Sequence, residues 1–136
     1  MAGSILVDSG FLVALLNRHD SNHAWASALA MRYPPQWVTC DAVLSETFVL
    51  LGASGLPAIA ELISRGALSS TFRFSDGGTD ILKLMQKYAD VPMTFADACL
   101  VRMTEIVSDP TLLTTDADFR KYRRLGRKAV PCLLPG

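Results

Sequence analysis

Short apolar segments typical of β-strands alternate with helical segments along almost the whole sequence. The first strand is predicted at Ser4–Val7, and the turn-forming triplet Asp8-Ser9-Gly10 separates it from an apolar helical segment that begins at Phe11. Further strands are predicted at residues 36–39, 70–74, 111–113 and 129–133, the last of them at a sheet edge because Pro131 interrupts it. This alternation predicts an α/β fold with a short, mostly parallel sheet flanked by helices.

Helices are predicted between these strands, at residues 24–33, 42–54, 57–65, 79–88 and 95–107. A glycine-containing break separates residues 42–54 from residues 57–65, and Pro57 suits the first turn of a helix, so this pair is predicted to form a helical hairpin. Thr94 is the predicted N-cap of the helix at residues 95–107.

Length and composition predict one domain spanning residues 1–136, because 136 residues of which half are hydrophobic suffice for one core. The longest unbroken apolar run, Phe11–Leu16, is too short to cross a bilayer, and Met1–Ser4 lack the basic start of an export signal. We therefore expect no membrane contact. Three widely spaced cysteines predict neither a disulfide framework nor a thiolate metal site, and they favour a reducing cytoplasmic location.

The charged residues are unevenly distributed, although 13 basic and 13 acidic residues give no net charge. This balance excludes a molecule-wide field that would attract nucleic acid from a distance. All the acidic residues lie at or before Asp118, whereas six bases lie within the nine residues 120–128. We call these bases the basic strip: Arg120, Lys121, Arg123, Arg124, Arg127 and Lys128. It is either a solvated surface or a surface for a polyanion.

Two aspartates follow predicted strands closely. Asp8 comes directly after the first strand, and Asp116 follows residues 111–113 after two threonines. In open parallel sheets, binding sites lie beyond the carboxyl ends of the strands, so both side chains are expected in that crevice. The alternative is that each is a turn former or helix cap.

Two further carboxylates lie within predicted helices, on faces that we expect to be buried. Asp97 has Thr94 three positions before it, so it is alternatively the reciprocal acid of a capping box. Glu46 has no base among its neighbours three and four positions away. Because an unpaired buried carboxylate costs several kcal/mol, we expect a partner from outside the chain.

If these four carboxylates converge, they form a site for a divalent cation. At about 5 Å and an effective dielectric constant near 20, each pair repels by about 3 kcal/mol, which a hard cation removes. An all-oxygen site suits Mg²⁺ or Mn²⁺. Two such ions about 4 Å apart are able to support in-line phosphoryl displacement. The basic strip, which begins four residues after Asp116, would hold the phosphates of a polyanion beside them.

Four stretches carrying these acids resemble PIN-domain nucleases of the VapC-type toxin group: residues 5–16, 43–46, 88–98 and 113–119. They occur in family order and span nearly the whole chain. The resemblance implies a PIN-like three-layer sandwich and a Mg²⁺- or Mn²⁺-dependent endoribonuclease that cleaves structured RNA, tRNA or rRNA, by metal-activated water. It also implies a toxin-antitoxin pair, in which a cognate antitoxin blocks the groove, and homodimers.

The resemblance also assigns roles to residues. Asp8 and Asp97 are expected as direct metal ligands, Glu46 as a ligand directly or through water, and Asp116 as the fourth catalytic acid. Supporting roles fall to three further residues: Ser9 and Thr115, whose hydroxyls would orient carboxylates or water, and Asp118, which either supports Asp116 or faces the metal in its place. Gly10 departs from the family pattern, because many relatives have a hydroxyl or amide residue there.

Two alternatives remain open at this stage. A haloacid-dehalogenase-like phosphatase also places an aspartate after its first strand, but it needs a second aspartate where Gly10 stands. The other alternative is a catalytically silent PIN-like module that binds RNA or protein through the basic strip while the acids serve as helix caps.

Overall fold

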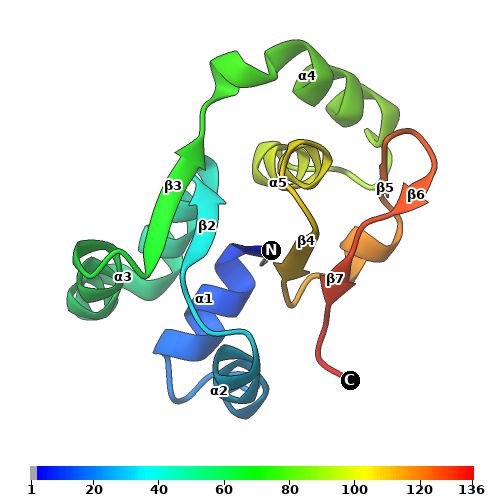
Figure 1. Cartoon of the computed structure of the whole chain (residues 1–136). Coiled ribbons are helices and arrows are strands. Elements are labelled where there is room, and N and C mark those ends of the chain that lie inside the picture. Colours follow the sequence, from blue (N-terminus) through cyan, green and yellow to red (C-terminus); the bar gives the residue numbers. More distant parts are fainter. Residues whose placement is uncertain (1–2) are drawn as a thin grey trace.

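The sheet is five-stranded and parallel throughout, with the strand order β3-β2-β1-β4-β7 (Figure 1). This computed structural model describes residues 3–136. Residues 1 and 2, which belong to the predicted domain and to the Met1–Ser4 stretch, lie outside the described residues. The strands are β1 (Ser4–Val7), β2 (Trp37–Cys40), β3 (Leu68–Phe72), β4 (Pro110–Leu113) and β7 (Cys132–Leu133). The predicted α/β fold is confirmed.

Helices cover both faces of this sheet: α1 (Ser9–Leu16), α2 (His23–Arg32), α3 (Asp41–Ser64), α4 (Gly78–Lys87) and α5 (Phe95–Ile106). Figure 1 shows α1 and α2 on one side of the sheet and α4 and α5 on the other. Two short 3-10 helices, η1 (Phe74–Asp76) and η2 (Ala117–Arg120), join longer elements. The predicted sandwich of a short sheet between helices is therefore present.

The two central strands, β1 and β4, carry the core and set the geometry beyond their ends. Leu6 of β1 and Leu112 of β4 are fully buried neighbours in the sheet. The register pairs Val7 with Leu113, so the next residues, Asp8 and Thr114, emerge side by side at the carboxyl edge. The proximity of Asp8 and Thr114 is thus decided by the pairing of two strands that lie more than 100 residues apart in the sequence.

The helix α3 is broken in the middle. Gly52 has φ 67° and ψ −171°, a conformation that favours glycine, and it separates two helical stretches. The break lies inside the predicted 42–54 helix rather than after it. By length and composition alone, α3 would suffice to cross a membrane, because it has 24 residues and an 18-residue window of it has a mean hydropathy of 1.6; the sequence-based expectation did not include this. Neither half has the roughly 20 residues that a spanning helix needs.

The C-terminal segment differs from prediction in one respect. Residues 129–133 do not form one strand but divide around Pro131 into β6 (Lys128–Ala129) and β7, which lies at the sheet edge as predicted. The strand β6 pairs antiparallel with β5 (Arg123–Arg124), a hairpin that the sequence analysis did not predict. This hairpin carries most of the basic strip.

Candidate active site

Asp8 is the best-anchored carboxylate beyond the sheet edge. It is 5% exposed and caps α1, with Oδ1 accepting a hydrogen bond from the Ser9 amide at 2.7 Å. Its Oδ2 accepts a hydrogen bond from the Thr114 hydroxyl at 2.7 Å. The pKa of Asp8 is raised to about 6: burial is the main cause, the two hydrogen bonds lower the pKa, and the charges of Asp97 and Glu46 contribute to the rise.

Glu46, on α3, is joined to Asp8 through one hydroxyl. The Ser9 hydroxyl donates to Glu46 Oε1 at 3.0 Å and lies 3.4 Å from Asp8 Oδ1. The expectation of a buried helix face around Glu46 is wrong, because Glu46 is half-buried and its neighbours Val49 and Leu50 are 79% and 62% exposed. The face of α3 that buries side chains against the core is the one that carries Val43 and Thr47.

Asp97 begins α5 and has two roles at once. The alternative of a capping box is confirmed, because the Asp97 amide donates to Thr94 Oγ1 at 3.1 Å and Asp97 Oδ2 accepts from the Thr94 amide at 3.4 Å. The same Oδ2 accepts from the Tyr122 hydroxyl at 2.8 Å. Burial raises the pKa of Asp97, the Tyr122 hydrogen bond lowers it, and the charge of Asp116 raises it. No described residue donates a hydrogen bond to Asp97 Oδ1, so this oxygen is available to a ligand.

Asp116 and Asp118 are in different environments. The Asp116 amide donates to Thr114 Oγ1 at 3.0 Å, so the Thr114 hydroxyl links Asp116 to Asp8. Asp116 also caps η2, accepting from the Asp118 amide at 2.9 Å. In contrast, Asp118 forms an ion pair with Lys121 at 3.0 Å. This pairing favours Asp116 over Asp118 as the fourth acid of the site.

The donor chemistry of these acids suits a hard divalent cation. All four offer carboxylate oxygens. The charges of Asp97 and Glu46 contribute to the raised pKa of Asp8, and the charge of Asp116 contributes to that of Asp97. A bound cation would remove this repulsion. Within residues 3–136, however, no three potential ligand side chains are drawn together tightly enough to hold an ion as they stand. Asp8 is linked to Glu46 through the Ser9 hydroxyl and to the Asp116 amide through the Thr114 hydroxyl, whereas the partners of Asp97 among the described residues are Thr94 and Tyr122. A cation would have to draw the four carboxylates closer.

Two residues of this site were missed by sequence reasoning. The hydroxyl contact predicted for Thr115 is made by Thr114, because Thr114 continues the β4 register beside Asp8. Thr115 lies instead against Gly10, where an added Cβ would clash with Thr115 Oγ1. This packing explains why position 10 has no side chain. The second missed residue, Tyr122, is fully buried. Its only signal in the sequence is that it is an aromatic residue between two bases of the basic strip.

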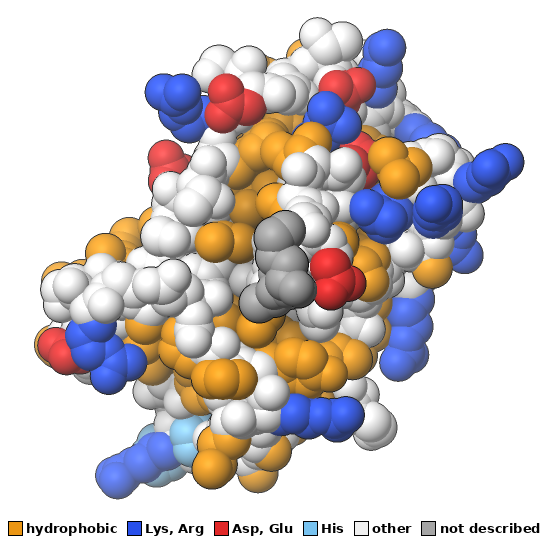
Figure 2. Space-filling model, in the orientation of Figure 1, with side chains coloured by type: hydrophobic (Ala, Val, Ile, Leu, Met, Phe, Trp, Pro, Cys, Tyr) orange, Lys and Arg blue, Asp and Glu red, His pale blue; other side chains and the backbone are white. Residues whose placement is uncertain are grey.

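The basic strip does not present all its bases to solvent. Arg124 turns back onto α5 and donates to the Thr104 carbonyl oxygen, and Arg123 donates to the carbonyl oxygens of Arg120 and Tyr122. Arg120, Lys121, Arg127 and Lys128 are exposed. Figure 2 shows Lys and Arg side chains gathered on the side of the molecule that carries α4 and the β5–β6 hairpin.

The carboxylates thus lie beyond the carboxyl ends of the two central strands, where open α/β sheets place their binding sites. The PIN domain profile matches residues 5–125, and the chain belongs to this nuclease family. Among solved structures, the chain is similar to Mycobacterium tuberculosis VapC20, a toxin that cleaves the sarcin-ricin loop. The two share 26% sequence identity over 85% of this chain and 92% of that chain, with a TM-score of 0.71. A comparison with curated protein sequences found no match.

These comparisons confirm the predicted resemblance and the PIN-like fold. They give no support to the haloacid-dehalogenase-like phosphatase.

Proposed function

We propose that this protein is a Mg²⁺- or Mn²⁺-dependent endoribonuclease that cleaves structured RNA, tRNA or rRNA, as the toxin of a toxin-antitoxin pair. The observation that carries the proposal is the linkage centred on Asp8, which is buried, has a pKa of about 6 and is joined by single hydroxyls to Glu46 and Asp116. A buried carboxylate near other carboxylates lowers the stability of the metal-free protein. Its presence therefore favours a function in which a cation binds there. The similarity to VapC20 supports RNA as the substrate.

In this proposal the chain's own residues hold and orient the site. Asp8, Asp97 and Asp116 would bind the cation directly, with Glu46 binding directly or through water. The hydroxyls of Ser9, Thr114 and Tyr122 fix carboxylate rotamers by donating to Glu46 Oε1, Asp8 Oδ2 and Asp97 Oδ2. The chemistry that bound Mg²⁺ or Mn²⁺ supplies is activation of water and neutralisation of charge on the leaving 3′ oxygen. The basic strip would position the RNA phosphates.

The exposed face of α3 supports a protein partner. Val49 and Leu50 line a hollow of about 420 Å³ together with Ser45 and Glu46, and Phe48 is also exposed. Apolar side chains exposed beside a functional carboxylate favour contact with another polypeptide. We propose that a cognate antitoxin covers this hollow and blocks the site, and that the protein forms homodimers. We expect it to act in the cytoplasm, which is consistent with its three free cysteines.

The test is cleavage of tRNAs and of an rRNA fragment containing the sarcin-ricin loop, with Mn²⁺, with Mg²⁺ and with a chelator. We expect cutting only with metal, and we expect Asp8→Asn to abolish it. The matched control is Glu61→Gln, which removes an exposed carboxylate in the second half of α3, outside the four family-like stretches, and should leave cutting unchanged. Metal-independent cutting, or equal cutting by Asp8→Asn, contradicts the proposed chemistry.

Binding without cutting by the wild-type protein would instead favour the silent binding module. The toxin role has a separate test: expression should arrest the host unless a small adjacent gene is co-expressed. Growth without arrest contradicts that role and leaves the nuclease activity to the cleavage assay.

A further inference from the structure

A second hollow lies between α4 and the β5–β6 hairpin, on the side of the molecule where bases gather in Figure 2. Its volume is about 260 Å³. We call it the α4–β5 groove, and it is lined by Asp80, Lys83, Leu84, Lys87, Glu105, Arg123 and Gly126. The α4 residues in this set are spaced three and four positions apart, so they form one face of the helix. None of the groove residues belongs to the acidic site.

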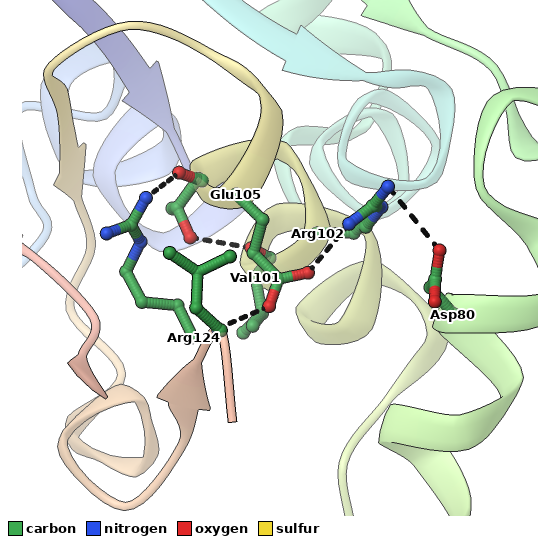
Figure 3. A network of polar contacts seen from close by, with 7 residues as sticks. Asp80, Val101, Arg102, Glu105 and Arg124 are labelled. Carbon is green, nitrogen blue, oxygen red and sulfur yellow. Dashed lines mark hydrogen bonds and ion pairs between the residues drawn. The ribbon is translucent and has the colours of Figure 1, made fainter. Parts of the chain in front are cut away.

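The two acids of the groove already have partners. Glu105 Oε1 lies 3.1 Å from Arg102 Nη1, and its Oε2 accepts from the Leu125 amide at 2.6 Å. Asp80 lies 3.4 Å from the other terminal nitrogen of Arg102. Figure 3 shows Arg102 between these two carboxylates, with Arg124 on the other side of Glu105. Arg102 thus pairs with both acids of the groove, whereas Arg124 donates to the Thr104 carbonyl oxygen.

The three bases that line the groove have no carboxylate partner among the described residues. Lys87 Nζ reaches only the Gly126 carbonyl oxygen, at 3.5 Å, and lies 5.2 Å from the Tyr88 ring centroid. Arg123 donates to two backbone carbonyl oxygens, and Lys83 is exposed on α4. With Arg102 and Arg124 behind them, five bases face two acids, a local excess of three positive charges. In a chain of zero net charge, this excess marks the groove as an anion site.

The distance along α5 relates the groove to the acidic site. Asp97 lies in the first turn of α5 and Glu105 near its end, eight residues later. At 1.5 Å per residue this separation is about 12 Å. A nucleic-acid strand that advances about 3.4 Å per nucleotide along its helix axis covers it in three to four nucleotides.

We propose that the α4–β5 groove binds RNA phosphates through Lys83, Lys87 and Arg123, three to four nucleotides from the bond that is cut. This inference rests on the proposed nuclease function and adds substrate-binding residues of α4 that lie outside the basic strip. Because the contacts are to phosphates, binding here is independent of base sequence and sensitive to salt.

The test compares Lys83→Gln/Lys87→Gln with Arg32→Gln/Arg65→Gln, a control that loses the same charge at exposed positions away from the groove. The probe is a fluorescently labelled ribosomal stem-loop RNA in chelator, from about 0.05 to 0.2 M salt. Each lost phosphate contact should weaken binding about fourfold at about 0.15 M salt, so the lysine pair should lose about 15-fold. The salt slope should fall by about 1.5, and Lys83→Arg/Lys87→Arg should restore both quantities.

The possible outcomes separate this inference from the proposed function. If the wild type cuts RNA with metal but Lys83→Gln/Lys87→Gln binds like the control, the groove inference is wrong and the nuclease proposal stands. A loss of binding in the control as large as in the groove variant also overturns the inference, because charge rather than position would then matter. If the wild type neither binds nor cuts, the nuclease proposal itself fails.

Discussion

Replacing the buried Asp8 by asparagine should stabilise the metal-free protein at neutral pH. The pKa of Asp8 is about 6 in the folded protein, against an ordinary value of 3.8, and this difference corresponds to about 3 kcal/mol of lost stability once the group is ionised. Asparagine keeps the shape without the charge but accepts one hydrogen bond fewer, which costs about 1 kcal/mol. The net gain is about 2 kcal/mol, or about 7 °C in Tm for a chain of this length.

The pH dependence of unfolding gives a second, independent check on whether the Asp8 charge destabilises the folded protein. A carboxyl group whose pKa is higher in the folded than in the unfolded chain makes the folded state bind the proton more tightly. Its contribution to stability is therefore greatest below about pH 4 and is lost as the pH rises through about 6. Relative to wild type, Asp8→Asn should gain about 2 kcal/mol between pH 4.5 and 7.5.

The assay is urea unfolding at several pH values in chelator, repeated with Mn²⁺ or Mg²⁺. Metal should stabilise the wild type, by about 2.7 kcal/mol at 100 times its Kd, and should leave Asp8→Asn nearly unchanged. A pH-independent difference between the two proteins would refute the reasoning about burial. An equal response to metal would refute the role of Asp8 as a ligand.

Three further changes probe the contacts around the site. Tyr122→Phe removes the hydroxyl that donates to the α5 carboxylate, which should lower the free energy of unfolding by about 1.5–3 kcal/mol; an unchanged urea midpoint would contradict this. Thr114→Val removes a hydrogen bond that lowers the pKa of Asp8, so a carboxyl NMR titration should show that pKa above about 6 rather than at or below it. Gly10→Ala should cost about 1–3 kcal/mol in thermal unfolding, because its Cβ would meet Thr115 Oγ1. Adding Thr115→Ala should recover most of this loss, and additive effects of the two changes would argue against the contact.

Local sequence patterns were sufficient for the features that depend on a few neighbouring residues. The alternation of apolar strands and helices predicted the parallel α/β fold, and Pro131 predicted the edge position of β7. The spacing of Thr94 and Asp97 indicated the capping box, which was the alternative considered for Asp97. Each of these follows from backbone dihedral preferences or from hydrogen bonds within one turn, which adjacent residues determine.

The sequence by itself thus determined the order of the elements and the placement of an aspartate directly after β1. Tertiary structure decided which side chains meet there. The pairing of β1 with β4 brought Thr114, not Thr115, to Asp8, and packing of the basic segment against α5 buried Tyr122 beside Asp97. It also left Val49 exposed on a helix whose composition suggested burial. The reason is physical: strand register and helix rotation are set by contacts between segments far apart in the chain, and no local pattern encodes them.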